Sequence, residues 1–191
     1  MIDRKFIIFD IETTDVHANV NLPQIVEIAA VKCTADLSVI DEFHEVIRPN
    51  RLEEFTQFSE SLTGLTPQEL ADAPAWKEVW KSWAKFTEWK HCRLFSWGGT
   101  DIAILRDEYK RISLGYPHNP MPICVASMVY MWGSLRGWKP KGLGLASVCK
   151  EFGIVIKGHH RAQADVQMTL AVLKHILQPD EEDAEVQIYA V

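Results

Sequence analysis

Two carboxylates stand two residues apart at the end of an apolar run near the start of this 191-residue chain. The run covers residues 6–9, all Phe or Ile, and Asp10 and Glu12 follow it. Such a run predicts a strand buried on both faces, and because side chains alternate along a strand, both acids point to one face. Paired acids at a buried strand end repel each other and lose hydration, which a divalent cation would compensate. An Asp-x-Glu tripeptide is also compatible with two solvated acids, so other residues have to decide.

Two more acids and a histidine stand where a metal site would need them. Asp101 follows a short apolar strand and a glycine pair, at the start of a predicted helix, where an acid also interacts favourably with the helix dipole by about 0.3–1 kcal/mol. Asp165 lies in the first turn of the last predicted helix, on the stripe that continues through Thr169 and Ile176. His160 precedes Asp165 by five residues. Taken singly, this histidine is also compatible with a surface loop.

The elements that must position these residues follow from periodicity and turn signals. Strands are expected over residues 6–12, 25–31, 39–47 and 94–97, and the first three form an antiparallel meander. A capping box at Thr66 begins a short helix, and the tryptophan stripe within residues 76–86 predicts a helix packed on the core. Further helices are expected over residues 100–112, 125–132, 145–152 and 162–176, with a Gly- and Lys-rich connector over residues 133–142.

Composition bounds the class of protein. The length predicts one domain, and 47% hydrophobic and 24% charged residues are typical of a globular chain. Four widely spaced cysteines form neither a zinc nor a redox motif, so we expect reduced thiols. We see no signal peptide and no apolar segment near the roughly 20 residues of a membrane span, so we expect a cytoplasmic protein without membrane contact.

The net charge of −6 does not decide whether nucleic acid is a partner. Five of the negative charges lie in the tail over residues 180–185. Without that tail and the four candidate metal ligands, the remaining surface carries about +3.

In order and spacing, Asp10-x-Glu12, Asp101 after a strand, and His160 ahead of Asp165 resemble the DEDDh family of 3′–5′ exonucleases. The resemblance covers residues 6–177. It implies an α/β, RNase H-like fold with a central mixed five-stranded sheet flanked by helices. The tyrosine variant of that family would have Tyr at position 161, where this chain has Arg161, so the histidine class is indicated.

Residues 47–49, 61–66 and 141–145 are similar to one branch of that family, which contains the histone-mRNA 3′-exonuclease and the RNA-interference-regulating exonucleases. The resemblance implies an exonuclease domain over residues 1–179, followed by an acidic C-terminal tail over residues 180–191. Members of the branch often carry an additional nucleic-acid-binding module before the catalytic domain. Because Asp10 lies only ten residues from the start, we expect no such module here.

The resemblance also implies a reaction. It is hydrolysis of single-stranded nucleic acid from the 3′ end to 5′-mononucleotides, with RNA favoured over DNA and two Mg²⁺ or Mn²⁺ ions as cofactors. His160 would be the general base, and Glu12 would act both in catalysis and on the 3′-hydroxyl of the terminal nucleotide. The metal ligands implied are Asp10, Glu12, Asp101 and Asp165, and the substrate-binding residues implied are Glu12, Thr13, His160 and a loop from Leu62 to Gly64 beside the terminal base.

Two other interpretations stay open at this point. One is a catalytically silent exonuclease fold used for nucleic-acid binding or regulation, against which the complete set of five residues argues. The other is a polymerase-associated proofreading subunit, which would share the chemistry and depend on a protein partner. The acidic tail or the tryptophan-rich helix would serve such docking, and a homodimer is a further alternative.

Overall fold

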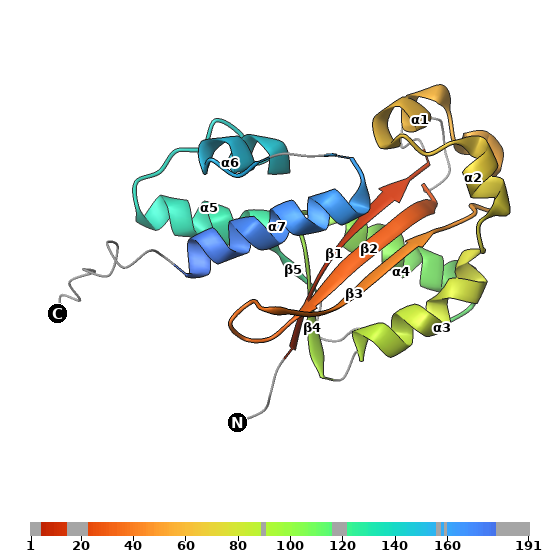
Figure 1. Cartoon of the computed structure of the whole chain (residues 1–191), viewed down its shortest axis with the longest axis horizontal. Helices are drawn as coiled ribbons and strands as arrows, with labels where there is room; N and C mark the ends of the chain where they lie inside the picture. Colours follow the sequence, from red (N-terminus) through yellow and green to blue (C-terminus); the bar gives the residue numbers. More distant parts are fainter. Residues whose placement is uncertain are drawn as a thin grey trace.

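The computed structural model describes residues 5–14, 23–88, 91–115, 122–155, 158 and 160–178. Within them, five strands form one sheet in the order β3-β2-β1-β4-β5 (Figure 1). The bounds are β1 Lys5–Thr13, β2 Ile25–Cys33, β3 Val39–Val46, β4 Cys92–Ser96 and β5 Ile123–Cys124. Strands β1 to β3 pair antiparallel, whereas β4 runs parallel to β1 and β5 runs parallel to β4. The predicted meander and the mixed five-stranded sheet are confirmed.

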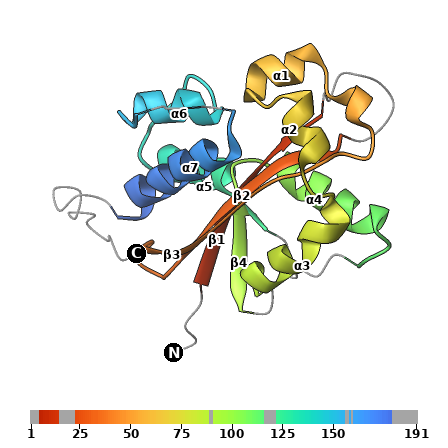
Figure 2. The same ribbon diagram turned by 45° about the vertical axis from the view of Figure 1, so that its right-hand side comes forward.

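Helices cover both faces of this sheet, and Figures 1 and 2 show the two groups on opposite sides. One face carries α3 Trp76–Thr87 and α4 Thr100–Arg111. The other carries α5 Val125–Leu135, α6 Leu145–Glu151 and α7 Ala162–Leu177. Three short helices, η1 Leu52–Glu54, α1 Gln57–Thr63 and α2 Pro67–Asp72, follow β3. The arrangement is the three-layer α/β fold that the sequence predicted.

The alternation of side chains along β1 divides the core in two. Ile7, Phe9 and Ile11 pack into the cluster formed with α3 and α4. Ile8 packs into the cluster formed with α5, α6 and α7. Even-numbered residues of β1 therefore face α7, and Asp10 shares that face.

The helix over residues 76–87 packs as its pattern predicted. Trp83 is fully buried, with its ring centroid 5.9 Å from that of Phe9 in an edge-on contact. The aromatic stripe is therefore part of the core and not a stacking platform for bases. The capping box at Thr66 and Glu69 is also confirmed.

Three local predictions are wrong or incomplete. Leu62 and Thr63, which were expected in a loop, lie at the end of α1, a helix that was not predicted; its buried positions are Ser59 and Thr63, so no apolar period marked it. The fifth strand, β5, has only two residues and is held by pairing with β4. The helix α5 continues to Leu135 through Gly133, because the Trp138 ring packs closely against that glycine.

None of the described helices is long and apolar enough to cross a membrane. The four cysteines, all within the described residues, are free thiols, as predicted. The acidic tail at residues 180–191 lies outside the described residues, and so does His159.

Candidate active site

The two acids of the first motif lie at the carboxyl end of β1. Strand β4 runs parallel to β1, so the chain leaves both strands at the same edge of the sheet, where α/β proteins commonly place their sites. Asp10 and Glu12 are each only 9% exposed. Like Ile8, both acids occupy even-numbered positions of β1, whose side chains point toward the layer that contains α7. Both carboxylates therefore lie on that side of the sheet.

Asp101 reaches the same edge from β4. The chain turns sharply after that strand, and the Ser96 hydroxyl donates to the carbonyl oxygen of Gly98 at 2.6 Å. The helix α4 then begins at Thr100, so Asp101 stands in its first turn. Its side chain is partly exposed, at the surface of the cleft described next.

One cleft of about 300 Å³ collects all five predicted catalytic and metal-binding residues. The described residues lining it are Asp10, Ile11, Glu12, Trp97, Gly98, Thr100, Asp101, Leu145, His160 and Asp165. Glu12, His160 and Asp165 approach most closely, with potential ligand atoms that all lie within 4.8 Å of one another. Residues separated by up to 155 positions in the chain therefore meet at one place.

A sharp turn ahead of α7 brings His160 into the cleft. Gly158 has φ 64° and His160 has φ 69°, and the Arg161 N–H donates to the Gly158 carbonyl oxygen at 3.1 Å. A left-handed conformation is uncommon for a residue with a side chain, although histidine is among the residues enriched there. As a result, His160 lines the cleft while its neighbour Arg161 binds elsewhere.

Arg161 instead binds Glu27 of β2, a residue for which no role was predicted. Glu27 is fully buried and pairs with Glu12 across the β1–β2 ladder. Its carboxylate accepts hydrogen bonds from the Arg161 guanidinium at 2.8–3.2 Å and from the Ala162 N–H at 3.0 Å, and His44 Nε2 lies 2.8 Å from it. Glu27 thus caps α7 in place of the Arg161 side chain, which makes no cap hydrogen bond. An isolated acid inside the β2 run was the only sequence signal.

The contacts of Glu27 keep it ionised despite its burial. Burial alone would raise the pKa of Glu27, but the hydrogen bonds from Arg161, Ala162 and His44 outweigh it and lower the pKa below the ordinary value. A buried, charged and fully bonded carboxylate joins β2 to the start of α7. It therefore fixes the segment that carries His160 and Asp165.

In contrast to Glu27, three acids of the cleft have pKa values above their ordinary values. Lost hydration, followed by the charges of Asp165, Glu27 and Asp101, raises the pKa of Glu12 to about 8. Burial and then the charge of Asp165 raise the pKa of Asp101 to about 7. Burial, and then the charges of Asp101 and the other acids, raises the pKa of Asp10 well above its ordinary value. The acids destabilise one another's charged forms.

This donor set fits divalent metal ions. The described residues lining the cleft include four carboxylates and an imidazole but no lysine or arginine. Carboxylate oxygens are the ligands that Mg²⁺ and Mn²⁺ prefer, and such an ion would relieve the repulsion among the acids. A metal centre is therefore what this arrangement can hold.

Three of the predicted substrate-binding residues, Thr13, Leu62 and Gly64, do not line the cleft. Thr13 is half-buried and follows Glu12 at a register shift in the β1–β2 ladder. Leu62 is 38% exposed in the last turn of α1, and Gly64 ends that helix with φ 71°. Figures 1 and 2 show α1 beside the carboxyl end of β1, but neither Leu62 nor Gly64 lines the cleft. Their contact with a base stays a prediction.

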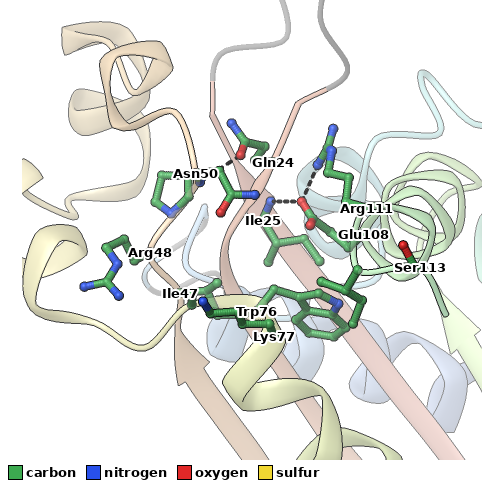
Figure 3. A pocket seen from close by; sticks show the side chains of 13 residues that line it. Gln24, Ile25, Ile47, Arg48, Asn50, Trp76, Lys77, Glu108, Arg111 and Ser113 are labelled. Atoms are coloured by element: carbon green, nitrogen blue, oxygen red, sulfur yellow. Dashed lines mark hydrogen bonds and ion pairs between the residues drawn. The ribbon is translucent and has the colours of Figure 1, made fainter.

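A second cavity, of about 380 Å³, lies between β2, α3 and α4 and is lined by different residues (Figure 3). There Glu108 accepts a hydrogen bond from the Ile25 N–H at 3.3 Å and pairs with Arg111. Arg111 also donates to the Pro23 carbonyl oxygen at 3.1 Å. These contacts fix the beginning of β2, so Glu108 and Arg111, the main polar groups of this cavity, stabilise the fold.

Residues 7–173 match the model of the exonuclease family that is named after RNase T. The chain therefore belongs to the exonuclease family, which confirms the predicted family of nucleases.

The chain is also similar in sequence to individual curated proteins. Among curated proteins, it is 28% identical over 177 residues to the PolC-type DNA polymerase III of Bacillus cereus, covering 92% of this chain and 11% of that protein. It is 32% identical over 174 residues to the same enzyme of Lactococcus lactis, covering 88% of this chain and 10% of that protein. The chain thus spans about a tenth of the length of these relatives.

Solved structures share the fold. Cell-death related nuclease 4 superposes with a TM-score of 0.83 at 15% identity, covering 93% of this chain and 64% of that one. The nuclease domain of 3′hExo, a DEDDh family member bound to rAMP, gives 0.78 at 21% identity and covers 92% of both chains. Escherichia coli exonuclease I in complex with a dT13 oligonucleotide gives 0.76 at 20% identity, covering 92% of this chain and 42% of that one.

Proposed function

We propose that this chain removes 5′-mononucleotides from the 3′ end of single-stranded nucleic acid. The observation that carries the proposal is the cleft at the carboxyl end of β1, in which four acids meet His160. Two of the structural neighbours are described with a dT13 oligonucleotide and with rAMP, which supports this substrate class. The exonuclease domain over residues 1–179 and a cytoplasmic location stay predictions.

Each group in the cleft has a role in this proposal. Two Mg²⁺ or Mn²⁺ ions, held by the four carboxylates, would act as Lewis acids that neutralise charge on the scissile phosphate. His160 takes a proton from the attacking water as general base, the role that an imidazole most often has in catalysis. Glu12 contributes a metal ligand and, with Thr13, a contact to the 3′-hydroxyl of the last nucleotide. Arg161 and Glu27 hold His160 in place from outside the cleft.

A second candidate is a proofreading function within a DNA polymerase assembly. The similarity to PolC-type polymerases, at up to 32% identity over most of this chain, favours it. The chemistry would be the same, but the substrate would be a DNA primer end and a protein partner would be required. Our prediction that RNA is favoured over DNA opposes this candidate.

One experiment tests the function and separates the two candidates. Single-stranded RNA and DNA of the same sequence, labelled at the 5′ end, are incubated with the protein and Mg²⁺ or Mn²⁺. We expect a ladder of labelled products that shortens stepwise, faster for RNA, and no products after EDTA is added. Faster hydrolysis of DNA would favour the proofreading candidate. Release of the label as a mononucleotide at the outset would contradict the proposed polarity, and activity in EDTA would contradict the metal site.

A further inference from the structure

The acids of this chain are distributed unevenly. The sequence contains 26 Asp and Glu residues and has a net charge of −6, yet residues 109–150 contain none. An even distribution would place about six acids in a segment of that length. The same segment contains six basic residues: Lys110, Arg111, Arg136, Lys139, Lys141 and Lys150. An acidic protein therefore has one strongly basic segment.

Five of these six charges fall into two groups, and the sixth, Lys150, is exposed in the last turn of α6. Lys110 and Arg111 pair with neighbouring acids in α4. By contrast, Arg136, Lys139 and Lys141 are exposed on the connector between α5 and α6, and no salt bridge found within the described part of the chain involves them. The Arg136 guanidinium lies over the Trp132 ring, 4.8 Å from its centroid, which leaves Lys139 and Lys141 as the connector charges available to a partner.

A groove runs beside these charges. It has a volume of about 540 Å³, and its lining includes Tyr130, Trp138, Lys139 and Leu143. Tyr130 is 56% exposed. Trp138 is held firmly: its N–H donates to the Gly133 carbonyl oxygen at 2.9 Å, and its ring packs on that glycine. We call this surface the α5–α6 groove.

The α5–α6 groove adjoins the catalytic cleft. Trp97 lines the cleft, and its indole N–H donates to the carbonyl oxygen of Leu143 at 2.9 Å, while Leu143 lines the groove. Leu145, two residues further along the chain, lines the cleft again. Residues 143–145 therefore form a wall that the two sites share. The groove and the cleft are thus adjacent on the surface of the protein.

We infer that the α5–α6 groove binds the single strand on the 5′ side of the scissile phosphate. This inference rests on the proposed function, in which the 3′ end occupies the cleft. The lining of the cleft provides acids and no lysine or arginine among the described residues, so the upstream phosphates require positive charge elsewhere. Lys139 and Lys141 supply charge for the backbone, while the exposed ring of Tyr130 and the partly exposed ring of Trp138 offer stacking surfaces for bases of any sequence.

The test compares two charge-matched variants. Lys139→Gln with Lys141→Gln removes one positive charge from the lining of the groove and one from the exposed residue between the lining residues Pro140 and Gly142. Lys77→Gln with Lys81→Gln removes two exposed charges from α3, on the other face of the sheet, and serves as the control. Binding of a fluorescent strand of about twelve nucleotides is measured by anisotropy in EDTA, over a series of salt concentrations. Hydrolysis of that strand and of a dinucleotide is then measured with Mn²⁺.

We expect the groove variant to bind the long strand at least about ten-fold more weakly, with a salt slope reduced by about 1.4, because two phosphate contacts are lost. Tyr130→Ala should weaken binding at least about five-fold through lost stacking. Hydrolysis of the dinucleotide should stay within about two-fold of wild type, and the control should resemble wild type throughout.

Two results would overturn the inference. One is equal strand binding by the groove variant and wild type, which would leave the groove to a protein partner. The other is an equal loss on the dinucleotide and the long strand, which would place the effect in the cleft. Because binding is measured without turnover, a protein that binds strands through the groove but hydrolyses neither substrate would contradict the proposed function and not the groove.

Discussion

Replacing Glu12 with glutamine should stabilise the metal-free protein at alkaline pH, although it removes a predicted metal ligand. Burial first, and then the charges of Asp165, Glu27 and Asp101, raises the pKa of Glu12 from 4.5 to about 8. Because the pKa in the folded state exceeds the pKa in the unfolded state, ionisation of Glu12 opposes folding. That cost is absent below pH 4.5, grows as the pH rises toward 8, and is constant above it. Glutamine has a similar shape and cannot ionise.

The pKa of Glu12 sets the size of the effect. A tenfold change in a protonation equilibrium is worth about 1.4 kcal/mol, so the difference between 4.5 and about 8 corresponds to at most about 5 kcal/mol above pH 8. At pH 7 the limit is about 3 kcal/mol, and at pH 5 it is below about 1 kcal/mol. In a domain of this size, 1 kcal/mol changes the melting temperature by about 2–4 °C. We therefore expect Glu12→Gln to melt up to about 10–20 °C above wild type at pH 8.5 in EDTA.

The assay is thermal unfolding in EDTA at pH 5, 7 and 8.5. Wild type and Glu12→Gln should melt together at pH 5 and diverge as the pH rises. Glu42→Gln, at an exposed position on β3, should follow wild type at every pH. Added Mn²⁺ should raise the melting temperature of wild type more than that of Glu12→Gln, because the variant has lost a ligand. A variant no more stable than wild type at pH 8.5 in EDTA would show that the protein itself compensates the Glu12 charge, and our electrostatic argument would be wrong.

Three further predictions concern the cleft and its support. Asp10→Ala should abolish turnover yet melt no lower than wild type in EDTA, since it relieves repulsion among the acids; wild-type activity would refute the metal assignment. His160→Ala and His160→Asn should each lose about 10²–10⁴-fold in single-turnover rate at saturating Mn²⁺, whereas His159→Ala should stay within a few-fold of wild type. If His159→Ala were the damaged variant, the assignment of the general base would be wrong. Glu27→Ala should lower the free energy of unfolding, measured in urea, by about 3–5 kcal/mol, because it leaves the Arg161 charge unpaired. A change below about 1 kcal/mol would show that water solvates the Arg161 guanidinium in the variant.

The sequence by itself determined the features that depend on local periodicity. The alternation of side chains in β1 put Asp10 and Glu12 on one face before any tertiary contact was known, and both acids line the cleft. The stripe of α7 placed Asp165 in its first turn on the sheet-facing side. The capping box at Thr66 started α2 at the expected residue because its hydrogen bonds lie within one turn of helix. In order along the chain, these acids and His160 were also enough to indicate the exonuclease class.

Tertiary structure decided what depends on partners distant in sequence. Glu27 lies in an apolar strand that could be recognised locally, but its role depends on Arg161 and Ala162, more than 130 residues away. The two-residue β5 exists only because β4 offers it a pairing edge. Likewise, the α5–α6 groove lies beside the cleft because the Trp97 indole N–H donates a hydrogen bond to the Leu143 carbonyl oxygen. Local patterns predict which face a side chain occupies, whereas the neighbours that give a buried charge or an exposed ring its function are set by how the layers pack.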